Sequence, residues 1–225
     1  MHRPLSRYSY LLPFLLFPAL MAAHGVSASD QEILSNGGLV AYIRVGATHM
    51  LTGYDHLLFL AGVIFYLKGF KDIFRFITVF TIGHSITLTG ATYLGIQADE
   101  HLIDAVIALS VLYKGFENLG GFKRMGVDAP NLLVMVFAFG LIHGFGLSTR
   151  LQSFDMGEGQ FLPKILCFNL GVELGQITAL IPIVFLITQW QKYRSYQAFY
   201  KAVNVYLVIA GVVLFCWQMW NYLRA

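Results

Sequence analysis

The chain has 225 residues, of which 57% are hydrophobic and only 12% are charged, and its formal net charge is +3. Soluble domains carry about 25% charged residues, so this composition excludes an ordinary soluble domain. The small net charge gives no indication of nucleic-acid binding. The two cysteines, Cys167 and Cys216, lie in apolar stretches without paired spacing, which argues against a disulfide or a thiolate metal site.

Residues 1–23 have the features of a cleaved secretory signal peptide. A basic start with Arg3 and Arg7 precedes the apolar core Tyr10–Met21, and small residues follow it. An uncleaved helix is the alternative interpretation. Cleavage after residue 23 would make His24 the new N-terminus, where the α-amine and imidazole together can chelate a metal, although a free tail is the simpler expectation.

The remainder, residues 24–225, is predicted to be an all-α polytopic bundle of about six transmembrane helices. Apolar stretches near the bilayer-spanning length of about 20 residues recur along it. The first span starts with Leu39–Leu51, which is short and carries Arg44 and His49, and Tyr54–Leu67 completes it. The other five spans are expected at Ile73–Leu94, Leu102–Leu119, Leu132–Leu151, Leu162–Thr188 and Phe199–Tyr222.

Basic residues concentrate in alternate loops, which predicts an orientation. The basic loops contain Lys68, Lys71, Arg75, Lys123, Arg124, Lys192, Arg194 and Lys201. The positive-inside rule places these loops in the cytoplasm. We therefore expect a multi-pass protein of the bacterial inner membrane, in contact with lipid, whose mature N-terminus and C-terminus both lie outside. The sequence does not indicate an oligomeric state.

Ionisable side chains within membrane spans are costly and usually mark function. The candidate metal ligands are His49, Asp55, His56, His84, His143 and Glu173. The first three are expected toward the outer face, and the last three near mid-membrane. His49 and His56 are seven residues apart, so they would share a face if their helix is continuous. Alternatively, each His could simply hydrogen-bond a neighbouring helix.

This ligand set has a defined chemistry. Imidazole and carboxylate groups suit nickel, cobalt, zinc, copper or iron ions. The polar neighbours that could orient these ligands are Ser85, Asn169 and Gln176. Lys114 and Glu117, spaced i,i+3, are predicted to pair in a mainly structural role, although Glu117 could serve an inner exit. His101 is expected in a solvated outer loop.

Several of these segments resemble the HupE/UreJ family of bacterial nickel/cobalt permease-like proteins. The resemblance rests on His49-x5-Asp55-His56, Gly83-His84-Ser85 and Gly140-x-x-His143-Gly144. The segment Asn169-Leu-Gly-Val-Glu173-Leu-Gly-Gln176 is similar to the second type of this family. The resemblance implies divalent metal transport, with His49, Asp55, His56 and His143 as functional positions. The better-known permeases carry a further His and Glu where this chain has Phe139 and Gly146.

Three functions are compatible with this pattern. The favoured one is a secondary permease for a divalent transition metal, nickel or cobalt by resemblance, which would not be an enzyme. The second is an intramembrane zinc-dependent hydrolase with His84, His143 and Glu173 as ligands and Asp55 as base, since catalytic zinc needs three ligands and an open position. The third is a metal sensor, or an assembly partner for a periplasmic metal-binding protein.

Overall fold

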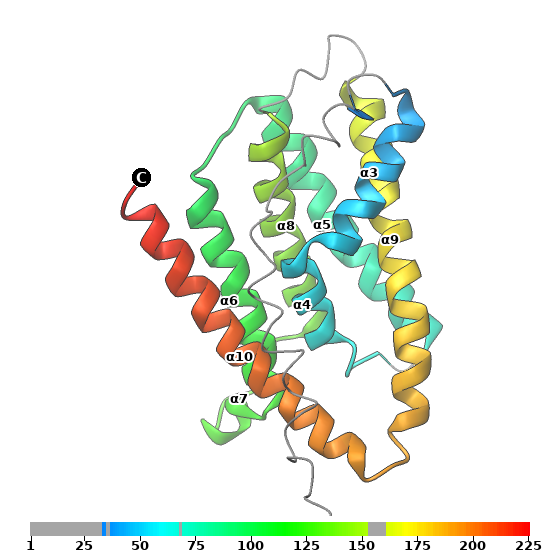
Figure 1. Ribbon diagram of the computed structural model, residues 1–225, viewed down its shortest axis with the longest axis vertical. Helices are drawn as coiled ribbons and strands as arrows, with labels where there is room; N and C mark the ends of the chain where they lie inside the picture. The colour runs from blue at the N-terminus through cyan, green and yellow to red at the C-terminus, as the bar shows by residue number, and fades with distance from the viewer. Residues whose placement is uncertain (1–32, 35–36, 68, 153–160) are drawn as a thin grey trace, which may run out of the picture.

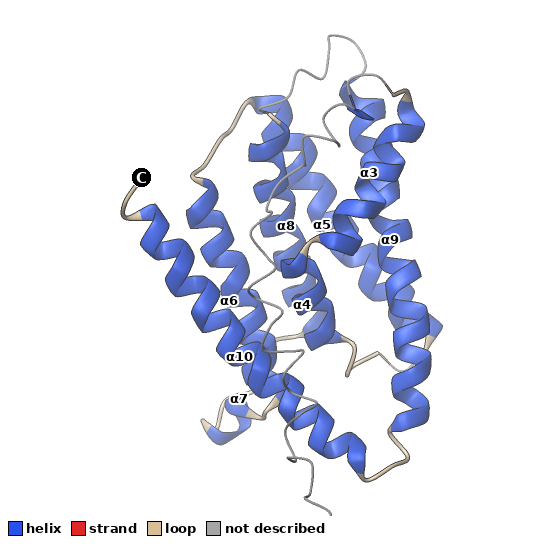
Figure 2. Cartoon of the chain, in the orientation of Figure 1, coloured by secondary structure: helices blue, strands red, loops and turns tan. Residues whose placement is uncertain are grey.

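The computed structural model describes residues 33–34, 37–67, 69–152 and 161–225, which form helices and no strands (Figure 2). This confirms the predicted all-α class. The predicted signal peptide, residues 1–23, and His24 lie outside the described residues and stay predictions. The described helices are α3 (Leu39–Thr52), α4 (Tyr54–Val63), α5 (Phe70–Leu94), α6 (Glu100–Asn118), α7 (Gly121–Arg124), α8 (Leu132–Leu151), α9 (Phe161–Trp190) and α10 (Ser195–Tyr222).

Local sequence signals set several helix ends. The Asp99 carboxylate accepts a hydrogen bond from the Leu102 N–H at 3.0 Å and caps the start of α6. The Asn131 side chain caps α8 in the same way, through the Leu133 N–H at 3.0 Å. At its other end, α5 stops at Gly95, whose φ of 64° is the left-handed conformation that glycine adopts without strain.

Four of the described helices are long and apolar enough to cross a membrane: α5, α8, α10 and the Leu162–Trp190 part of α9. The other two predicted spans correspond to α6 and to the consecutive pair α3 and α4. Helix α6 has 19 residues but carries several charged side chains. Helices α3 and α4 have 14 and 10 residues. Together they supply about 36 Å of helix, enough for a hydrocarbon core of about 30 Å.

The long helices run alternately up and down the bundle (Figure 1). They pack most extensively in the pairs α5–α8, α6–α10 and α3–α9. The starts of α5 and α10 and the short α7 gather at one end, while the start of α3 and the C-terminus lie at the other. We call the first the basic end, because it carries Lys71, Arg75, Lys123, Arg124, Lys192 and Arg194.

Glycines bring the helix backbones of two pairs into direct contact. A Cβ at Gly140 of α8 would collide with the Phe80 carbonyl of α5, and one at Gly144 with the His84 carbonyl. A Cβ at Gly171 of α9 would collide with a carbonyl of α3. Small residues at helix contacts allow this close approach within a membrane. The α5–α8 contact matters most for function, because it fixes the helices that carry His84 and His143.

Candidate functional site: a histidine cluster at a helix break

The first span is broken between two of the predicted ligands. Gly53 separates α3 from α4 and is extended, with φ −66° and ψ 109°. His49 lies in the last turn of α3, where its carbonyl accepts the Gly53 N–H at 2.8 Å, and His56 lies in the first turn of α4. The continuous helix that would have placed these residues on one face is therefore absent here.

The break brings the two rings closer than a helix would. Seven residues of continuous helix separate side chains by about 10.5 Å along the axis. Across the break, the ring centroids of His49 and His56 lie 5.0 Å apart. Their proximity was predicted, but it arises from the turn at Gly53 and not from helical periodicity.

His143 of α8 extends this pair into a cluster of three rings. Its centroid lies 5.1 Å from that of His56, and both side chains are buried. The Nδ1 of His143 is 2.7 Å from the Phe139 carbonyl oxygen. A carbonyl only accepts, so Nδ1 donates, and in the neutral ring the lone pair is on Nε2. This orientation of a ring by a backbone carbonyl is typical of histidine metal ligands.

The spacing of the rings suits a shared metal ion. A metal–nitrogen bond of about 2.1 Å puts two tetrahedrally arranged ring centres about 5 Å apart. The observed separations of 5.0 and 5.1 Å match this value. His56 was predicted near the outer face and His143 near mid-membrane, so the two rings lie closer together than predicted. Within the described part of the chain, however, no three His, Cys, Asp or Glu side chains form a ready metal-binding group.

His84 of α5 lies beside the cluster and is fully buried. Its ring stacks on Phe80 with a centroid separation of 6.0 Å, and Phe80 in turn lies 5.4 Å from His143. Neither ring nitrogen of His84 has a hydrogen-bond partner among the described residues. Buried polar atoms in folded proteins are nearly always bonded. The ring therefore fits a site that binds a polar or charged substrate.

Two amides of α9 show the same property. Both side-chain polar atoms of Asn169 and the Oε1 of Gln176 are buried without a hydrogen-bond partner in the described residues. Asn169 follows Phe168, whose ring centroid is 5.9 Å from that of His49. Amide oxygens and imidazole nitrogens are both suitable donors for a divalent ion. The chemistry of these buried donors fits a metal substrate.

The remaining predicted residues are less closely connected to the cluster. Glu173 is half-buried on α9. Among the described residues, Glu173, His84 and His143 do not form a group of three that could bind one metal ion. Ser85 is half-buried on α5 beside His84. The backbone of Asp55 lies in α4, but its side chain lies outside the described residues. The roles of these three residues stay predictions.

An aromatic layer, which the sequence reasoning missed, closes the side of the cluster that faces the basic end. Helix α4 runs toward this end, whereas α5 and α8 run away from it, so Phe59, Phe80 and Phe139 each lie about one turn nearer to it than the His residues of their helices. The centroids of Phe59 and Phe80 lie 5.8 and 5.4 Å from that of His143. The sequence signal for this layer was the spacing of each Phe from the His on its own helix. Phe59 follows its His by three residues, and Phe80 and Phe139 precede theirs by four.

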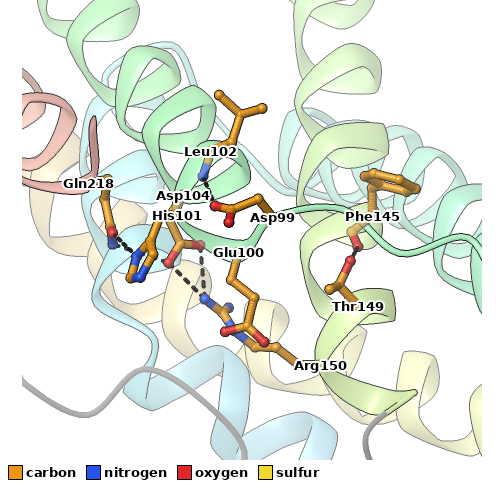
Figure 3. Close-up of polar contacts among 9 residues, drawn as sticks. All are labelled: Asp99, Glu100, His101, Leu102, Asp104, Phe145, Thr149, Arg150 and Gln218. Carbon is orange, nitrogen blue, oxygen red and sulfur yellow. Dashed lines mark hydrogen bonds and ion pairs between the residues drawn. The ribbon is translucent and has the colours of Figure 1, made fainter. Parts of the chain in front are cut away.

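A second polar network lies at the opposite end of the bundle and links α6, α8 and α10 (Figure 3). Arg150 Nη2 donates to both carboxylate oxygens of Asp104, at 2.9 and 2.7 Å. Gln218 Nε2 donates to Asp104 at 3.2 Å, and its Oε1 accepts from His101 Nδ1 at 2.9 Å. His101 was expected in a solvated outer loop. It lies instead in the first turn of α6, where its ring is half-buried and bonded to α10.

Comparison with known proteins identifies the family of this chain. The family model described as HupE / UreJ protein matches residues 27–224. The chain belongs to the HupE/UreJ family. It matches none of the curated proteins and none of the solved structures with which it was compared. Membership in the HupE/UreJ family, together with the apolar helices, makes this a membrane protein, and it confirms the resemblance found in the sequence.

Proposed function

We propose that this HupE/UreJ protein transports a divalent transition-metal ion across the bacterial inner membrane. One observation carries the proposal: His49, His56 and His143 meet at a helix break inside an apolar bundle, with centroid separations of 5.0 and 5.1 Å. Broken helices at mid-membrane are a recurring way to build ion sites in transporters. The resemblance to permeases favours nickel or cobalt, while the donor chemistry also suits zinc, copper or iron.

The proposed mechanism uses a ring cluster and an aromatic barrier. The metal enters from the end opposite the basic end and exchanges water for the rings of His49, His56 and His143, which bind it as neutral imidazoles. The carboxylate of Asp55 and the amides of Asn169 and Gln176 are further candidate donors. The layer of Phe59, Phe80 and Phe139 then separates the metal from the basic end, which the positive-inside rule assigns to the cytoplasm.

The zinc hydrolase receives no comparable support. It requires His84, His143 and Glu173 on one ion with an open fourth position. Glu173 is only half-buried, so it is the least enclosed of these three ligands. Transport places fewer requirements on the site, because a carrier binds its ion reversibly and needs no fixed open coordination position on the metal.

The experiment is metal uptake into proteoliposomes, with nickel, cobalt, zinc, copper and iron ions tested separately. We expect His56→Ala to lower uptake at least 10- to 100-fold, since losing even a group that orients a ligand has an effect of that size. The matched control is His101→Ala, which removes a His outside the cluster and should keep uptake close to wild type. No uptake of any of these ions by the intact protein would refute the transport proposal.

A further inference from the structure

A second pair of ionisable residues is buried in the bundle, away from the histidine cluster. Lys114 Nζ lies 2.7 Å from Glu117 Oε2, which confirms the predicted i,i+3 pair. The free energy needed to move two charges out of water is about as large as the free energy of their mutual attraction. A buried ion pair is therefore poor evidence of a stabilising role. Within a membrane bundle such a pair indicates function by default.

Among the described residues, the Lys114 ammonium and several phenols surround Glu117. The Lys114 ammonium lies 4.1 Å from the centroid of the Tyr66 ring, and the Tyr66 phenol interacts electrostatically with Glu117. The titratable groups that face Glu117 from α6, α10 and the end of α4 are Lys114, Tyr113, Tyr200 and Tyr66. Phe122 of α7 and Phe139 of α8 pack against Tyr113.

Of the two charged groups, Glu117 is the one that reaches toward water. The Lys114 side chain is 1% exposed and that of Glu117 is 9% exposed. Glu117 lies in the last turn of α6, just before α7 with Lys123 and Arg124 at the basic end. A proton from the water at this end can therefore reach the carboxylate, while the ammonium stays sealed behind it.

Helix α4 connects this pair directly to the histidine cluster. His56 lies in its first turn, and a Cβ at Gly62 would lie only 2.9 Å from the Lys114 Cβ, so α4 packs closely on the pair. The axial distance from His56 to Gly62 is about 9 Å. A second link is the Phe139 ring of the aromatic layer, whose centroid is 5.6 Å from that of Tyr113. Charges separated by a low-dielectric bundle interact more strongly than charges at the same separation in water.

Building on the transport function proposed above, we propose that the Lys114–Glu117 pair is the proton-binding site that couples metal movement to an opposite movement of protons. A proton from the basic end adds to a carboxylate oxygen of Glu117, while Lys114 keeps its own proton. The pair then changes from net charge zero to +1. A divalent ion in the histidine cluster disfavours this positive state. In the state open to the end opposite the basic end, metal binding therefore expels the proton to that end. In the state open to the basic end, a new proton adds to Glu117 and favours metal release there.

The test compares two measurements on the same proteoliposomes, with radioactive nickel(II) as the first probe and cobalt(II) and zinc(II) as alternatives. The first is exchange of labelled for unlabelled metal at equal concentration and equal pH. The second is net accumulation driven by a pH difference of one unit, imposed in each direction with the membrane potential clamped to zero. One exchanged proton per ion supports about tenfold accumulation under this gradient.

The decisive variant is Glu117→Gln, which keeps the shape and a carbonyl acceptor but cannot carry the proton. At saturating metal we expect it to exchange within about twofold of wild type, which also shows that it is folded, and to lose the tenfold accumulation. Its half-saturating metal concentration should rise, because the pair then stays at net charge +1. Glu117→Asp, which retains a carboxylate, should keep both activities. The coupling proposal is overturned if Glu117→Gln still accumulates metal, if it loses exchange as well, or if the wild type exchanges metal but ignores the pH gradient. A wild type without exchange refutes transport itself, and the coupling with it.

Discussion

Gly144 offers a sharp test of the backbone contact that holds the histidine helices together. In Gly144→Ala, the new Cβ would collide with the His84 carbonyl oxygen and with the Thr87 hydroxyl, and it would lie 2.8 Å from the His84 carbonyl carbon. Neither helix can relieve this by rotating a flexible side chain, because the obstacle includes backbone. The expected loss is that of overpacking, about 2 kcal/mol.

The measurement is the thermal unfolding midpoint of the purified protein in detergent. For a chain of this size 2 kcal/mol corresponds to a decrease of about 4–8 °C. Gly90→Ala is the matched control on α5, since a Cβ there would meet nothing within 4 Å. The control should be neutral or stabilising by up to about 1 kcal/mol, because alanine favours a helix over glycine. Equal midpoints for both variants would refute the close contact of α5 with α8.

Two further predictions concern the helix break and the polar network. In Gly53→Ala, alanine favours a continuous helix by about 1 kcal/mol. The apparent Kd for metal, measured by calorimetry, should therefore rise by up to about fivefold. Unchanged or tighter binding would contradict this. Arg150→Ala removes the bidentate partner of Asp104 and should lower stability by about 3 kcal/mol. Arg150→Lys should lower it less, since the charge is kept, and the reverse order of unfolding midpoints would speak against the pairing.

The apolar periodicity was sufficient to predict most of the helices. The predicted Leu132–Leu151 is α8 to the residue, and the predicted Ile73–Leu94 differs from α5 only at its start. Apolar length alone determines such elements, because a helix is the only unclosed structure that satisfies its backbone in lipid. The pairing of Lys114 with Glu117 was equally predictable, since i,i+3 neighbours face each other on any helix.

The geometry of the site could not be predicted in the same way. The direction of the turn at Gly53 determines how far His56 lies from His49, and two torsions of a glycine carry no sequence signal of their own. The pairing of Arg150 with Asp104 joins residues that are far apart along the chain. Such contacts depend on the relative rotation of two helices, which apolar length does not determine.

The break at Gly53 also bears on which metals the site can distinguish. The part of the cluster on α4 is adjustable, because two backbone torsions set its spacing from His49 of α3. The part on α8 is rigid, because the backbone of α8 touches that of α5. Nickel, cobalt and zinc differ in preferred coordination geometry. We therefore expect substitutions near His84 and His143 to alter the preference among metals, and those around Gly53 to change the affinity for all of them alike.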